Sequence, residues 1–328
     1  MVSFFKEKST SAVFSLIVVS AGIRAFFWVH PPQLIIAPGD GLMFYLLSPL
    51  ANIPALLLPL LYQAIVVIQA LRFNYALNDV RMFPKPAFTT ALAYIMLTAL
   101  LPAWNNISSA LVTNTMLIWL LYFIIKLYNS QQPKTLIFNI GLITGSTVIL
   151  YFAAFPLILV VFFTLAAFRP FRLNEWFILL MGILAPFYFL ATWLFMNDKL
   201  YMALTWFHVF QPHTIIIQPG SMLPVIITFL MAGITIIAGI FSWQSNSGRM
   251  IIQVRKNWSV LFIMLLLLAP VVFLVKDMWP AALLLAAVPA SAFISNTFLY
   301  SKKNIIPAII FWIIVALVIY NNWFAAKI

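Results

Sequence analysis

Apolar residues follow one another along this chain in runs of helix length, and short polar stretches separate the runs. About 20 apolar residues cross a bilayer as one helix, whereas barrel strands show alternating segments of roughly ten residues. The pattern therefore predicts an all-α polytopic membrane protein, in which each run is one membrane-spanning helix. The eleven predicted spans are 11–29, 52–72, 86–104, 109–128, 135–152, 154–170, 175–196, 223–243, 258–275, 279–299 and 305–324.

The fifth and sixth spans could instead form one long kinked helix, because "YFAAFPL" between them has almost no polar residue. A single helix there would be about 54 Å long at 1.5 Å per residue, well beyond a hydrocarbon core of about 30 Å. Two helices are therefore expected. The whole chain, 1–328, is interpreted as a single transmembrane domain, in which two long outer segments, 29–51 and 197–222, interrupt the helices.

Composition restricts the class of protein further. Hydrophobic residues make up 65% of the chain and charged residues only 7%, which excludes a water-soluble domain. The chain has no cysteine, so disulfides and cysteine-ligated metals are excluded. The net charge of +12 would suggest nucleic acid in a soluble protein, but here the basic residues lie between spans. No nucleic-acid partner is expected.

The basic residues predict the orientation of the chain, because cytoplasmic loops of membrane proteins are enriched in lysine and arginine. With a cytoplasmic N-terminus, fourteen of the 18 basic residues fall inside, and the outer ones are Arg24, Lys199, Lys276 and Lys327. The same orientation places outside all three histidines and three of the six acids: His30, His208, His213, Asp40, Asp198 and Asp277. A functional site is therefore predicted on the outer face.

The two long outer segments are predicted to lie on the membrane surface. In the first, Pro49 and Pro54 interrupt a long apolar stretch, which predicts a short interfacial helix before the chain enters the bilayer near Asn52. The second, 197–222, alternates aromatic and apolar residues with polar ones, which also predicts a position on the membrane surface. Together they would bound a shallow cavity suited to a substrate with a lipid tail and a polar head.

Arg24 lies within the apolar run "SAGIRAFFWVH", where a charge is costly. Two interpretations stay open: the side chain reaches the outer headgroups, or its guanidinium binds an anionic phosphate.

The stretch "IRAFFWVHPPQLIIAPGDGLMFYLL" resembles the first outer loop of polyprenyl-phosphate-dependent glycosyltransferases of the GT-C fold. Two further stretches resemble the third to sixth helices of that family: "LTALLPAWNNISSALVTNTMLIWLLYFIIKLY" and "FNIGLITGSTVILYFAAFPLILVVFFTLAAFRPFR". Together they cover about the first 200 residues, and 223–328 would add C-terminal helices. The resemblance implies transfer of a sugar or glycan from a polyprenyl-phosphate-linked donor to an acceptor, with Asp40 in the place of the catalytic acid.

Glycosyl transfer requires a base near the acceptor and positive charge near the leaving phosphate. Asp40 is the predicted base, although Pro-Gly-Asp-Gly is also an ordinary turn sequence. Asp198 is a candidate second acid, and "NDK" at 197–199 also fits a helix end. Asn114 stands where some family members carry a second acid. The candidate phosphate-binding residues are Arg24, His30, His208, His213 and Lys199.

No cofactor and no metal-binding pair are evident, and involvement of a divalent metal is left open. His208 and His213 are five residues apart, with Pro212 between them, unlike a helical metal-binding pair. The expected partners are the lipid-linked sugar donor and membrane lipids. A lipid-linked substrate transporter or flippase, a polysaccharide polymerase and a non-catalytic membrane subunit of a larger complex are the alternatives.

The whole chain also resembles an uncharacterised integral membrane family of Bacteroidetes, through its "FFK" start and its "FRPF" followed by "EW". This resemblance implies a multi-pass protein of a bacterial inner membrane.

Overall fold

The computed structural model of the chain describes residues 2–7, 9–36, 40–201, 222–275, 279–301 and 305–324. Within these ranges, eight helical segments are long and apolar enough to cross a membrane. They are Leu58–Asp79, Ser109–Leu127, Pro133–Leu150, Leu173–Met196, Leu223–Arg249, Ile252–Phe273, Pro280–Tyr300 and Ile305–Trp323. The protein is therefore a mostly helical, multi-pass membrane protein, as the apolar runs predicted.

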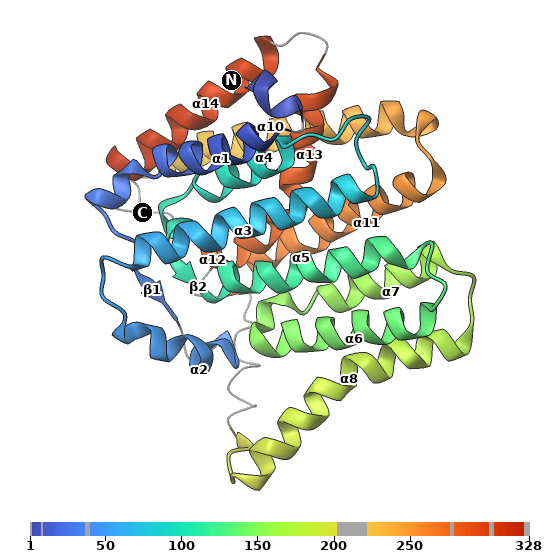
Figure 1. Cartoon of the computed structure of the whole chain (residues 1–328). Helices are drawn as coiled ribbons and strands as arrows, with labels where there is room; N and C mark the ends of the chain where they lie inside the picture. The colour runs from blue at the N-terminus through green and yellow to red at the C-terminus, as the bar shows by residue number, and fades with distance from the viewer. Residues whose placement is uncertain are drawn as a thin grey trace.

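The elements follow one another along the chain as shown in Figure 1. The longer helices are α3 (Leu58–Asp79), α5 (Ser109–Leu127), α6 (Pro133–Leu150), α8 (Leu173–Met196), α10 (Met222–Asn246) and α11 (Ile252–Leu268). The shorter ones are α1 (Thr10–Ile23), α2 (Met43–Leu47), α4 (Thr89–Thr98), α7 (Leu157–Phe168), α12 (Trp279–Leu283), α13 (Ala287–Tyr300) and α14 (Ile305–Ile319). Two short strands, β1 (Leu34–Ile35) and β2 (Ile107–Ser108), form a parallel pair.

Each of the eleven predicted spans coincides with a described helical segment. Eight of these segments have the length of a membrane span, whereas α1, α4 and α7 have 14, 10 and 12 residues. The number of crossings and their orientation stay predictions. The prediction of two helices around "YFAAFPL" is confirmed, because α6 ends at Leu150, a 3-10 turn covers Phe152–Ala154 and α7 begins at Leu157.

The boundaries of α3 differ from prediction at both ends, as do those of α11. The predicted span began at 52, but the helix begins at Leu58 with Pro59 in its first turn, a position that proline favours. The predicted span ended at Arg72, whereas α3 continues for two further turns to Asp79. Asn78 stabilises this extension, since its side chain donates to the Ala87 carbonyl at 2.9 Å. Arg72 therefore lies within the helix and not in a loop.

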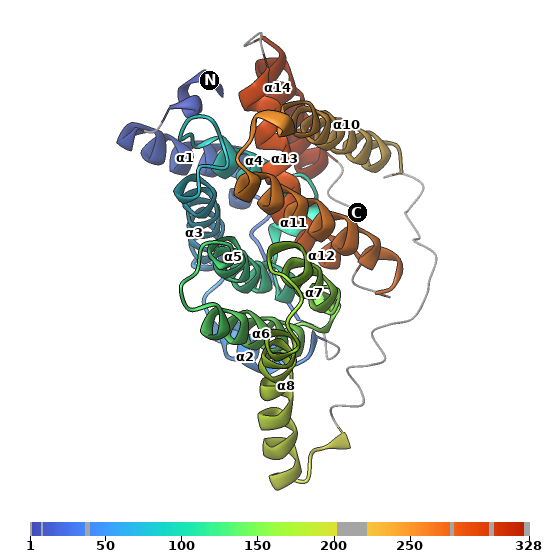
Figure 2. The same cartoon turned by 90° about the vertical axis from the view of Figure 1, so that its right-hand side faces the viewer.

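The centre of the bundle is formed by α4 and α13, which pack against each other (Figure 2). Every residue of α4 is buried, as is most of α13. A helix that is apolar all round is buried on all sides, and small hydroxyl residues bind the two helices across their contact. Thr89 and Thr90 of α4 both contact the Ser295 hydroxyl of α13, at 2.7 Å and 3.1 Å.

Glycines set the contact between α6 and α8. A Cβ atom at Gly145 would lie 2.3 Å from the Ile183 carbonyl oxygen, and Gly141 faces Gly182 at similarly short range. The small residues let the two backbones approach closely. Beyond this contact α8 diverges from the bundle, and its last turns, with Phe189 and Met196, are exposed (Figures 1 and 2).

The first outer segment folds back onto the turn between α4 and α5. β1 pairs with β2 in the register Leu34 with Ile107, and the Gln33 amide donates to the Asn106 side chain at 2.9 Å. The expected short helix is present as α2, followed by a 3-10 turn over Ser48–Asn52. Figure 1 shows α2 and the two strands at one end of the bundle, which is the predicted outer end. The interfacial position of α2 stays a prediction.

Candidate functional site

Arg24 is buried at the C-terminal end of α1, which is the predicted outer end, with only 2% of its surface exposed. Its Nη1 donates to the Ser20 hydroxyl at 2.9 Å, and its Nη2 donates to the Thr98 hydroxyl at 2.8 Å and to the Ile95 carbonyl at 3.2 Å. The guanidinium also lies over the Tyr62 ring, 5.3 Å from its centroid. These contacts fix the charge inside the protein and not among the outer headgroups.

No carboxylate of the described residues pairs with this buried cation. The ion pair found in that part of the chain joins Arg169 and Glu175, at 3.0 Å, near the start of α8. A buried charge is normally paired, because removing it from water costs several kcal/mol. Arg24 is therefore a buried cation for which the described residues supply no counter-ion, an arrangement that suits the binding of an anion.

A cavity of about 460 Å³ lies directly beside Arg24. Two of its lining residues carry a buried donor that has no hydrogen-bond partner among the described residues: Nε of Arg24, and Nε2 of Gln63, which lies one turn and a half along α3 from its first residue. The remaining lining is almost entirely apolar: Ala21, Phe27, Trp28, Pro31, Ala55, Leu56, Pro59 and Leu60. A ligand with an anionic or strongly accepting group on an apolar tail matches this arrangement.

Asp40 is also buried, 3% exposed, at the N-terminus of α5. Its Oδ2 accepts a hydrogen bond from the hydroxyl of Ser109, the first residue of α5, at 2.6 Å. The amide groups of a helix N-terminus favour a negative charge at that position. Asp40 is thus fixed in position at the start of α5 by its hydrogen bond with Ser109.

Gly41 is required for this placement. It has φ +72°, and a Cβ atom there would lie 2.5 Å from the Ile149 carbonyl oxygen. The next residue, Leu42, donates its amide to that same oxygen at 3.1 Å. The outer segment therefore docks on the last turn of α6 through a close contact between two backbone segments.

Tyr151, which follows α6 directly, completes the surroundings of Asp40. Burial raises the pKa of the Tyr151 hydroxyl above its ordinary value, and the negative charge of Asp40 raises it further. The hydroxyl therefore stays protonated, and it has no hydrogen-bond partner among the described residues. A neutral donor and a carboxylate acceptor thus lie in the same buried region, where a ligand hydroxyl could contact both.

The two clusters occupy the same end of the bundle but share no direct contact in the described part of the chain. Arg24 contacts α1, α3 and α4, whereas Asp40 contacts the start of α5 and acts electrostatically on Tyr151, which follows α6. The Tyr62 hydroxyl, beside Arg24, donates to the Trp104 carbonyl at 2.9 Å, which links the Arg24 cluster to the turn that leads into α5.

The other predicted site residues are placed apart from these clusters. His30 is exposed after the 3-10 turn that follows α1. Asp198, with φ +53°, and Lys199 form the C-terminal end of α8, where the Asp198 and Lys199 amides donate to the Phe195 and Leu194 carbonyls. His208 and His213 lie outside the described residues. In the ranges that are described, no group of three or more histidine or acidic residues could hold a metal ion.

Asn114 belongs to a polar network in the middle of the bundle. Its Nδ2 donates to the Leu284 carbonyl at 3.0 Å and to the Tyr94 hydroxyl at 3.3 Å. Tyr94 in turn donates to Gln69 at 2.7 Å. The network joins α3, α4 and α5 with the segment before α13. In the described part of the chain, Asn114 therefore connects helices.

Sequence reasoning missed Ser109, Tyr151 and Gln63. Ser109 and Tyr151 fall at the outer ends of predicted spans, which is the signal that could have selected them. Gln63 is a polar residue inside an otherwise apolar run, and such residues within a membrane span often mark a site.

Comparison with protein-family models, with curated proteins and with solved structures found no match to this chain. The function is therefore inferred from the residues and their geometry.

Proposed function

We propose that the protein binds a polyprenyl-phosphate-linked sugar or glycan at its outer end and transfers the glycan to an acceptor, with Asp40 as the general base. The observation that carries the proposal is the buried Arg24, which has no carboxylate partner among the described residues and lines a mostly apolar cavity. The resemblance of the first 200 residues to GT-C glycosyltransferases supports the reaction type.

Binding of a lipid phosphate would satisfy both parts of the Arg24 cavity. The phosphate supplies the missing negative charge and accepts from the free Nε of Arg24 and from Nε2 of Gln63. The first isoprene units lie against the apolar lining, with Leu56 and Leu60 at the start of α3. Positive charge next to the leaving phosphate also stabilises the transition state as the glycosyl bond breaks.

Asp40 accepts the proton of the acceptor hydroxyl as that oxygen forms its bond to the anomeric carbon and the phosphate leaves. Ser109 orients the carboxylate, and the neutral Tyr151 hydroxyl donates a hydrogen bond to the acceptor. Because Asp40 is buried, the mechanism requires that substrate binding opens a path to the carboxylate.

Replacement of Arg24 by glutamine is expected to weaken the binding of a polyprenyl phosphate by roughly 10- to 100-fold, because a charge-assisted hydrogen bond contributes about 1.5 to 3 kcal/mol. The binding of the corresponding polyprenol, which has no charge, should change little. Affinities are measured by titration of the detergent-solubilised protein with each lipid.

The control is stability. Arg24→Gln also loses hydrogen bonds to Thr98 and Ile95, so the unfolding of the variant is compared with that of the wild type, and affinities are compared only if the variant is folded. Equal affinity of the wild type and a folded Arg24→Gln variant for polyprenyl phosphate would contradict the proposed role of the cavity.

A further inference from the structure

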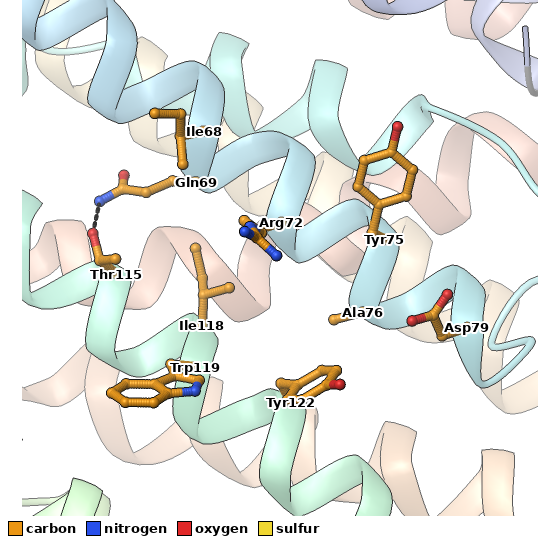
Figure 3. Close-up of a pocket in the computed structure, with 10 residues that line it drawn as sticks. All are labelled: Ile68, Gln69, Arg72, Tyr75, Ala76, Asp79, Thr115, Ile118, Trp119 and Tyr122. Carbon is orange, nitrogen blue, oxygen red and sulfur yellow. Dashed lines mark hydrogen bonds between the residues drawn. The ribbon is translucent and has the colours of Figure 1, made fainter. Parts of the chain in front are cut away.

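A second cavity, of about 470 Å³, lies in a groove between α3 and α5 (Figure 3). Ile68, Gln69, Arg72, Tyr75, Ala76 and Asp79 line it from α3, and Thr115, Ile118, Trp119 and Tyr122 line it from α5. Both helices have the length and apolar character of membrane spans. Ile68 and Trp119 are 56% and 51% exposed, so the groove opens on a surface that faces lipid.

The groove changes in chemistry along its length. Its inner end is apolar, with Ile68 and Ile118, and the Gln69 amide there is already bonded to the Thr115 hydroxyl at 2.8 Å. Arg72 follows one turn along α3, and Asp79 ends the helix (Figure 3). The order along α3 toward its C-terminal end is therefore apolar, cationic and then anionic.

The side chain of Arg72 has no hydrogen bond, ion pair or ring contact in the described part of the chain, and the same holds for the side chain of Asp79. The two residues are seven positions apart, on the same face of α3 and about 10.5 Å apart along its axis, so they do not neutralise each other. Asp79 also places a negative charge at the C-terminal end of a helix, where the helix dipole disfavours it. A cation near Asp79 would relieve that repulsion.

We propose that this groove binds a phospholipid with a primary ammonium headgroup, such as phosphatidylethanolamine. The lipid phosphate accepts from Arg72, the ammonium donates to Asp79 and one acyl chain lies against Ile68, Ile118 and the Trp119 ring. The order of groups in the lipid, acyl chain, phosphate and then amine, matches the order of groups along the groove. This site is separate from the Arg24 cavity and does not depend on the proposed reaction.

The two charges select this headgroup over other phospholipids. An anionic headgroup, as in phosphatidylglycerol, would lack a partner for Asp79. A choline headgroup carries positive charge, but its methylated nitrogen has no hydrogen to donate. The second nearby cation, Lys126, lies over the Tyr122 ring at 4.1 Å and bonds to the Tyr122 hydroxyl, so it is already engaged.

Native mass spectrometry of the full chain in detergent, with added palmitoyl-oleoyl phosphatidylethanolamine, phosphatidylcholine or phosphatidylglycerol, tests the proposal. We expect the wild type to bind the ethanolamine lipid roughly tenfold more tightly than the other two, as one charge-assisted hydrogen bond predicts. Asp79→Asn should remove this preference, and Arg72→Gln should weaken binding of all three lipids. Arg249→Gln makes the same charge change as Arg72→Gln on an exposed residue away from the groove. It should alter neither the preference for the ethanolamine lipid nor the affinity for the three lipids.

The proposal is overturned if the wild type binds the three lipids equally, or if Asp79→Asn keeps the preference for ethanolamine. It is also overturned if Trp119→Ala converts a dimer into a monomer without any change in lipid binding, because the groove would then be the contact between two copies. Arg72 and Asp79 are exposed, so both variants should fold. Loss of lipid preference with intact binding of polyprenyl phosphate would separate this site from the Arg24 cavity.

Discussion

Replacement of Asp40 by asparagine is expected to lower the rate of glycan transfer by about 10²- to 10⁴-fold, the usual contribution of a positioned general base. Asparagine keeps an oxygen that can accept the hydrogen bond from Ser109, which is 2.6 Å from Asp40 in the wild type. It cannot take a proton from the acceptor. The measurement is the initial rate at which surface glycans appear in cells that lack the gene and carry the variant in its place.

Ser109→Ala serves as the matched control for this prediction. It removes the same hydrogen bond from the other side but leaves the carboxylate in place, so it should reduce the rate far less than Asp40→Asn. If Asp40→Asn instead preserves the rate and only lowers stability, Asp40 is a structural residue that anchors the outer segment to α5. Accumulation of a lipid-linked sugar on the inner leaflet would favour a flippase.

Replacement of Gly239 by alanine is expected to destabilise the protein by about 3 kcal/mol, since overpacking a close contact typically costs 1 to 3 kcal/mol and occasionally more. A Cβ atom at Gly239 would lie 1.9 Å from the Phe293 carbonyl oxygen of α13. The same contact holds two interhelical hydrogen bonds, from Asn296 to the Gly239 carbonyl at 3.0 Å and from Thr297 to the Thr235 carbonyl at 2.9 Å. Separation of α10 from α13 would weaken both hydrogen bonds. Unfolding is followed by titration with a denaturing detergent.

Gly233 offers a control on the same helix, because a Cβ atom there meets no other atom within 4 Å. Gly233→Ala should leave stability unchanged or raise it by up to about 1 kcal/mol through its higher helix propensity. Equal unfolding of the two variants would show that α10 and α13 do not pack as closely as described.

The helices were largely predictable from the residues, and the reason is local. In a bilayer every backbone group must be satisfied within its own segment, so each long apolar run forms a helix wherever it occurs. The predicted helix ends were wrong where a charged residue was taken as the end of a span, as at Arg72. A long charged side chain can reach water from within a helix, so it does not end the helix. The helix end at Asp198 and Lys199 was predictable because the polar sequence "NDK" follows the apolar run directly.

The site was only partly predictable. Arg24 and Asp40 stood out as charges in apolar surroundings, but their partners could not be read from the sequence. Ser109 is 69 residues from Asp40, and Thr98 is 74 residues from Arg24. Their proximity depends on which helices pack together, which in turn depends on small residues such as Gly239 and Gly145.

Helical class and the approximate position of each helix thus follow from the amino-acid order, because run length and backbone hydrogen bonding are local properties. Whether a polar residue is buried or exposed, and which groups it meets, was decided by helix packing. Arg24 is a candidate anion site because the tertiary structure buries it beside a cavity and brings no carboxylate of the described residues to it. Burial without a counter-ion depends on many distant residues at once, so the linear order of residues does not reveal it.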